Sequence, residues 1–154
     1  MTPPRSLAVL LLLIALISPS CSGSFQRDWR NATTAPAKPN TATIEGRWDG
    51  SWASDTNRHS GKLRCIISPA DRPGSYEFRY WGTFAKFFRF HYTVDYDARF
   101  TDGAWHMAGE NDLGIMGGKF HHEATIRGDK FDATYTSKWD NGKFELRRPT
   151  APTR

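Results

Sequence analysis

Cysteine is scarce in this sequence, whose 154 residues contain only two, Cys21 and Cys65. There is no Cys-x-x-Cys and no Cys/His zinc spacing, so neither a disulfide-rich scaffold nor a zinc module is indicated. No apolar run is long enough to span a bilayer as a helix, because the longest extends only from Leu7 to Ile17. These features exclude a polytopic membrane protein, and the short length excludes a multidomain enzyme or a TIM barrel.

Motifs for covalent catalysis are also missing. The sequence has no Gly-x-Ser-x-Gly and no Ser-x-x-Lys. Two carboxylate pairs, Asp95 with Asp97 and Glu110 with Asp112, lie near expected turns, where acidic residues are common. The sequence therefore predicts a protein that is not an enzyme, with no catalytic residue and no cofactor.

The N-terminus has the pattern of a secretory signal. Arg5 precedes an apolar run of about 11 residues, and small residues follow before Cys21. The segment 17–23 resembles the lipobox of bacterial lipoproteins, which are cleaved before a cysteine that then carries the lipid. We therefore expect a signal peptide over residues 1–20 and lipidation of Cys21, which makes the product a membrane-anchored lipoprotein of the bacterial envelope. Ordinary cleavage to a periplasmic or secreted protein and a Cys21–Cys65 disulfide remain alternatives.

The segment that follows the predicted signal peptide differs in composition from the rest of the chain. Residues 21–43 are rich in small polar residues and proline and show no period, which predicts a flexible tether. The folded domain is expected over 44–148, with a disordered tail over 149–154.

From Ile44 onward apolar and polar residues alternate with a period of two, typical of half-buried strands. No segment carries a helical apolar stripe, so little or no helix is expected. Short turns such as Asp102-Gly103 separate the strands. The alternating segments are centred on residues 44–52, 63–67, 76–80, 88–96, 105–107, 120–126, 131–135 and 144–146.

About eight strands joined by short turns predict an all-β domain. Closure into an antiparallel up-and-down barrel removes both exposed sheet edges, which favours the barrel over a β-sandwich. A sandwich would also need longer crossover connections.

Gly46-Arg47-Trp48 in the first strand, with Arg147 or Arg148 at the end of the last, resembles the lipocalin–avidin group of small barrels. The resemblance implies that Trp48 packs at the barrel floor under a late arginine, in a cation–π contact. It implies no particular ligand.

The sequence contains five histidines, which are candidate metal ligands. A turn at Asp102-Gly103 places His106 opposite Arg99 and away from His91. His121 and His122 are adjacent in a strand and so face opposite sides. We therefore predict no metal site, with His122 as a hydrogen-bonded core residue.

Two functions remain open. The first is a binding module that holds a small apolar ligand inside the barrel. The second is a structural or interaction protein of the envelope with a filled barrel, which the high aromatic content of 14% favours. Residues expected to line the interior, and therefore the ligand-binding candidates, are Trp48, Trp52, Phe78, Phe88, Phe90 and Trp105.

The formal net charge of +5 allows attraction to anionic envelope polymers or lipid head groups. The basic-aromatic run from Lys86 to Tyr92 is of a type that binds single-stranded nucleic acid. Export and the even spread of basic residues argue against nucleic acid as a partner.

Overall fold

The computed structural model describes residues 20–32, 43–85, 88–112 and 118–149. The predicted signal peptide, apart from Ser20, and most of the predicted tail lie outside these residues. The described chain forms one helix and a closed antiparallel barrel, and consecutive strands are neighbours throughout. The elements are α2 (Ser20–Asn31), β1 (Gly46–Ser54), β2 (Ser60–Pro69), β3 (Ser75–Phe84), β4 (Phe88–Thr101), β5 (Ala104–Asp112), β6 (Lys119–Arg127), β7 (Lys130–Ser137) and β8 (Asn141–Arg147).

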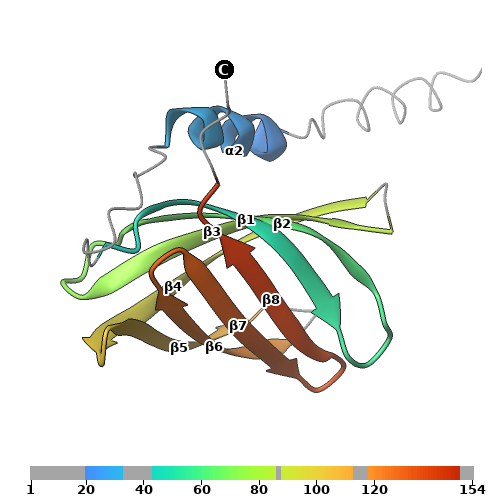
Figure 1. The fold of residues 1–154 in the computed structure, drawn as a ribbon. Helices are drawn as coiled ribbons and strands as arrows, with labels where there is room; N and C mark the ends of the chain where they lie inside the picture. The colour runs from blue at the N-terminus through green and yellow to red at the C-terminus, as the bar shows by residue number, and fades with distance from the viewer. Residues whose placement is uncertain (1–19, 33–42, 86–87, 113–117, 150–154) are drawn as a thin grey trace, which may run out of the picture.

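The all-β prediction and the closed up-and-down barrel are confirmed (Figure 1). Closure is made by β1 and β8, which pair from Asp49 opposite Arg147 to Ser54 opposite Gly142. Gly50 allows this approach, because a Cβ there would collide with the backbone of β8 at Glu145. The predicted hairpin at Asp102-Gly103 is also present, with positive φ at both residues, as a type I′ turn requires. This eight-stranded closed topology is compatible with a lipocalin–avidin-like fold.

Alternation within each strand separates an aromatic interior from a polar exterior. Trp48, Cys65 and Tyr80 are paired neighbours on β1, β2 and β3, and all three side chains are buried. Cys65 is a free thiol inside the barrel. Burial raises the pKa of this thiol well above its usual value, so it stays protonated and unreactive.

The two ends of the barrel differ. One end carries the start of β1, the end of β8 and the turn at Asp102-Gly103, and we call it the floor end. The other carries the β1–β2 loop, the β3–β4 hairpin and the β7–β8 turn, and we call it the mouth end. In Figure 1 the mouth end lies on the right.

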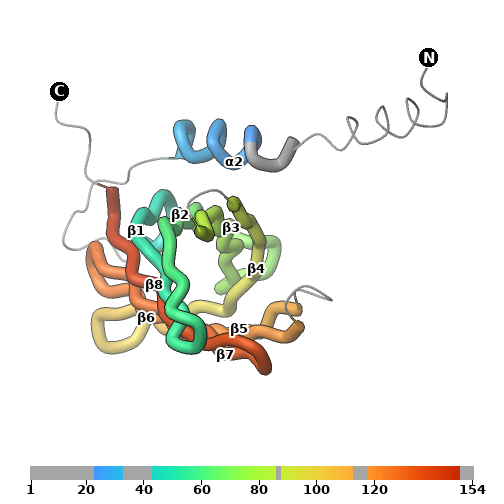
Figure 2. The backbone as a smooth tube through the Cα atoms, turned by 90° about the vertical axis from the view of Figure 1, so that its right-hand side faces the viewer, coloured from blue at the N-terminus to red at the C-terminus, as the bar shows by residue number. Residues whose placement is uncertain are grey.

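Helix α2 lies outside the barrel, across β1, β2 and β3 (Figure 2). Phe25 and Trp29, one helical turn apart, pack on the outward-facing Ile66 and Trp81. The guanidinium of Arg64 lies 4.9 Å from the Trp29 ring centroid, a cation–π contact.

A partly exposed ion pair between α2 and β3 adds to this contact. Asp28 accepts a hydrogen bond of 2.9 Å from Arg79, which lowers the pKa of the Asp28 carboxyl. The prediction of a tether without structure over 21–43 is therefore wrong for residues 21–31, which belong to α2, the one helix in the described residues. The helix is stabilised by apolar side chains on the barrel exterior rather than by a broad stripe of its own. Residues 33–42 lie outside the described part of the chain.

Candidate functional site

The floor of the barrel is closed by Trp48 and Arg148. The Trp48 indole is fully buried, and its Nε1 donates a 2.9 Å hydrogen bond to the carbonyl of Ile44. The Arg148 guanidinium lies 4.1 Å from the Trp48 ring centroid. It also donates hydrogen bonds to the carbonyls of Glu45 and Thr43. The predicted tryptophan–arginine pair is confirmed, with Arg148 rather than Arg147 as the cation.

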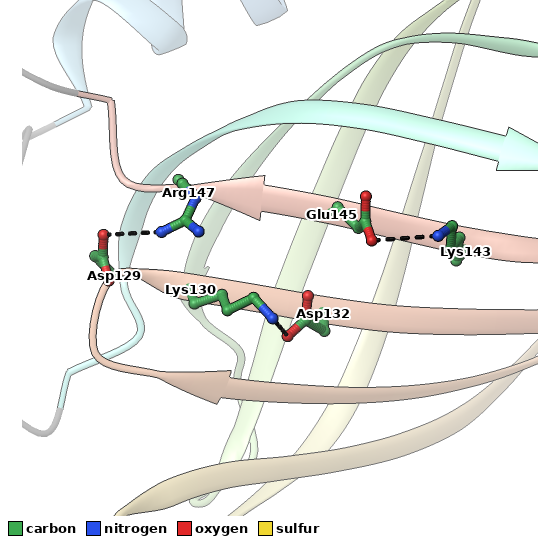
Figure 3. Close-up of polar contacts among 6 residues, drawn as sticks. All are labelled: Asp129, Lys130, Asp132, Lys143, Glu145 and Arg147. Atoms are coloured by element: carbon green, nitrogen blue, oxygen red, sulfur yellow. Dashed lines mark hydrogen bonds and ion pairs between the residues drawn. The ribbon is translucent and has the colours of Figure 1, made fainter.

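Arg147 lies on the outer surface instead. It forms an ion pair of 3.4 Å with Asp129 (Figure 3). Its position follows from the period of two along β8, where Leu146 faces in and Arg147 faces out.

The other predicted lining residues occupy different places. Phe78 is in the centre of the core, in edge contact with Phe131. Trp52 and Phe90 lie towards the mouth end, where their rings meet at 5.7 Å in an edge arrangement. Trp105 is half-buried near the floor end, against Tyr76.

Phe88 does not line the interior, and that prediction was wrong. Its side chain is 66% exposed, at the first residue of β4, with Phe84 as a ring neighbour. Alternation along β4 predicts the inward direction of Phe90, which lies within the closed barrel. Phe88 is on the same face of the strand, but it lies on the β3–β4 hairpin, which extends past the barrel interior.

The interior near the mouth end contains a polar group that the sequence did not single out as a site. His122 of β6 is only 3% exposed, and it faces inward while His121 faces solvent, as predicted. Among the described residues, neither Nδ1 nor Nε2 of His122 has a hydrogen-bond partner. The expectation of a hydrogen-bonded core histidine was therefore wrong.

Aromatic rings surround this imidazole. The centroids of five rings lie 6.0–6.5 Å from that of His122, and they belong to Tyr92, Tyr96, Phe120, Tyr135 and Phe144. Phe120, Tyr92 and Phe90 are only half-buried, so this part of the core reaches the surface at the mouth end. We call His122 and its five ring neighbours the His122 cluster.

The His122 cluster is uncharged at neutral pH. Burial lowers the pKa of His122 from 6.5 to about 4, and the neighbouring His121 adds to this shift. Burial also raises the pKa of Tyr92 and Tyr96 far above neutrality. The cluster therefore offers neutral rings, phenol hydroxyls and one imidazole that both donates and accepts.

One tyrosine in the cluster is held in place from outside. The Tyr135 hydroxyl donates a 3.1 Å hydrogen bond to Asp140, which also accepts one from Ser54. This network ties the β7–β8 turn to the end of β1 and fixes one wall of the cluster.

The outer face of β4–β8 carries a shallow groove of about 870 Å³. Side chains that border it include Lys143 and Glu145, which form an ion pair of 3.3 Å along β8. Lys130 and Asp132 pair in the same way on β7, at 2.8 Å (Figure 3). Such exposed ion pairs contribute little to folding stability and are typical of a solvated surface. The groove is therefore a weaker candidate for a binding site than the His122 cluster.

Metal binding has no support in the described residues, among which no three His, Cys, Asp or Glu side chains form a group that could hold an ion. His106 lies opposite Arg99, as the turn predicted. Helix α2, the one helix in the described part of the chain, lacks the length and apolar character needed to cross a bilayer.

Comparison of this chain with protein-family models, with curated proteins and with solved structures found no match, so the candidate site rests on the geometry described above.

Proposed function

We propose that the protein is a non-enzymatic, small-molecule-binding barrel whose ligand contacts the His122 cluster. The observation that carries the proposal is the imidazole of His122, which is buried and finds no hydrogen-bond partner for either nitrogen in the part of the chain that the structure describes. Leaving a buried donor or acceptor unpaired costs about 1–3 kcal/mol, so such groups normally have a partner. A bound molecule with one hydrogen-bonding group would supply it.

The chemistry of the cluster restricts the ligand. A charged molecule would lose its hydration without gaining an opposite charge, because the buried interior residues include no ionised side chain. Aromatic walls favour a flat or apolar body. The proposed ligand is therefore small, uncharged and mainly apolar or aromatic, with one donor or acceptor for His122.

The test is a pair of matched variants at adjacent positions of β6. His122→Phe removes the interior imidazole, while His121→Phe makes the same change on the exposed outer face. His122→Phe should fold, because it replaces an unpaired polar group by an apolar ring. Purified proteins are denatured, and the small molecules that they release are identified by untargeted mass spectrometry.

The wild type and His121→Phe should release the same uncharged compound. Its affinity for His122→Phe should be about tenfold lower, the effect of losing one hydrogen bond of about 1.4 kcal/mol. Release of no compound, or equal retention by both variants, would contradict the proposal.

The alternative function is a structural or interaction module with a filled barrel. The floor half favours it, because Trp48, Phe78 and Phe131 are fully buried and the Phe131 ring is in edge contact with both of the others. A wild-type protein that releases nothing, with a water molecule as the partner of His122, would support this alternative.

We further propose that the protein is exported and anchored to the bacterial envelope through a lipid on Cys21. The lipobox-like segment 17–23 supports this proposal.

We also propose that the barrel is related to the lipocalin–avidin group. The Trp48–Arg148 contact supports this resemblance.

A further inference from the structure

Exposed aromatic side chains mark the mouth end of the barrel. Within the described residues three large apolar side chains are exposed, and two of them are Phe88 on the β3–β4 hairpin and Trp139 in the β7–β8 turn. Their exposed fractions are 66% and 68%. Exposed rings on projecting turns have no role in the core, and aromatic side chains of this kind are enriched at membrane–water interfaces.

Among exposed residues without an ion pair to another described residue, the same end carries more basic than acidic side chains, the acids being Asp55 and Glu110. Arg58, Lys62, Arg89 and Lys138 are exposed, and none of them forms an ion pair with another described residue. Lys138 lies over the ring of Trp139, 4.8 Å from its centroid.

At the floor end two of the four exposed arginines are paired with carboxylates. Arg72 contacts Asp97 at 3.0 Å, and Arg147 contacts Asp129 at 3.4 Å.

The other two, Arg99 and Arg127, are balanced there by the exposed acids Asp71 and Asp102, and none of these four forms an ion pair with another described residue. The two ends of the barrel therefore differ in the charge that they present to a partner.

The direction of helix α2 is a separate observation. The carbonyl of Trp29, late in the helix, accepts a hydrogen bond from Arg47 near the floor end of β1. Phe25, one turn earlier, stacks on Trp81, which lies nearer the mouth end along β3. The helix therefore begins on the side of the mouth end, and Cys21 is in its first turn (Figure 1).

We propose that the mouth end docks on the surface of a membrane that contains anionic lipid, with Phe88 and Trp139 inserted among the head groups. The exposed basic residues of this end supply the charge complementarity. An anchor at the start of α2 would bring the same end to the bilayer. This inference is independent of the interior ligand, because the residues that carry it lie outside the His122 cluster.

The test measures which end of the full chain touches lipid. The protein is reconstituted into anionic vesicles whose acyl chains carry bromine, which quenches tryptophan fluorescence on contact. Trp139→Phe keeps an aromatic ring but removes one of the 6 indoles. Phe100→Trp adds an indole at the other exposed apolar position, next to the Asp102-Gly103 turn at the floor end.

The quenched share of the emission should fall in Trp139→Phe, and the indole added at position 100 should stay unquenched. Phe88→Ser, or replacement of the anionic lipid by a zwitterionic one, should reduce quenching of Trp139. An unchanged quenched share in Trp139→Phe, or equal quenching at position 100, would overturn the proposal. Ligand release from the barrel is measured without vesicles, so failure here is distinguishable from failure of the proposed function.

Discussion

Replacing Trp48 by alanine tests the closure of the barrel most directly. The indole is fully buried, its ring meets Phe131 at 5.6 Å in an edge contact, and Arg148 covers its other side. Emptying a buried aromatic site costs about 3–5 kcal/mol. The cation–π contact adds about 0.5–2 kcal/mol, and the Ile44 carbonyl loses its donor. We expect the free energy of unfolding to fall by about 4–6 kcal/mol.

The assay is equilibrium unfolding in urea, followed by far-UV circular dichroism. Trp139→Ala is the matched control, because its 68% exposed indole should contribute within about 0.5 kcal/mol. Arg148→Ala and the double variant complete a cycle, in which a coupling of about 1–2 kcal/mol is expected for the covered ring. A loss below about 1 kcal/mol in Trp48→Ala would refute the reasoning, since an unfilled or open floor would tolerate the change.

Three further predictions follow from individual residues. Burial in the folded state lowers the pKa of His122 from 6.5 to about 4. Between pH 6.5 and 4 this histidine is therefore protonated in the unfolded chain and neutral in the folded protein. Stability should therefore fall by about 3 kcal/mol as the pH drops from about 6.5 to 4, at about 1.36 kcal/mol for each pKa unit. Urea midpoints at both pH values measure this loss, and His122→Phe should remove it; an unchanged pH dependence would contradict the assignment. Trp29→Ala should free helix α2 from the barrel and accelerate amide hydrogen exchange over residues 20–31, because the ring contacts both Phe25 and the arginines. Arg27→Ala, whose side chain is exposed, is the control, and equal protection in both variants would refute the docking. Finally, labelled fatty acid should be incorporated into Cys65→Ala but not into Cys21→Ala; label retained by the latter would rule out lipidation at that cysteine.

The strands and their faces were predictable because their signal is local. Successive side chains of a strand point to opposite faces, so the alternation around Trp48 or His122 assigns the inside without knowledge of the partner strand. The contact between Trp48 and a late arginine was expected from the resemblance to the lipocalin–avidin group, which left Arg147 and Arg148 open, and the structure selects Arg148.

Helix α2 was not predicted because the residues that stabilise it include side chains of β2 and β3, far away in the sequence. Phe25 and Trp29 are its main apolar residues, and a stripe of two is too narrow to indicate a helix in isolation. Ile66 is a signal that could have found it, since it is an apolar residue on the outward face of β2 and needs a cover. Only the folded barrel brings Ile66 and Trp81 together under the helix.

The candidate site depended on tertiary structure for a different reason. The sequence by itself determined that His122 faces the interior, because that depends on position within one strand. Whether its nitrogens find partners depends on side chains from β4, β6, β7 and β8, which the barrel brings together as rings rather than as donors or acceptors. Likewise, the sequence pattern placed Phe88 in the barrel lining, and only the register of β3 with β4 shows that it lies on an exposed hairpin, at the same end of the barrel as Trp139. Local alternation fixes the direction of a side chain, but its neighbours are set by the register of distant strands.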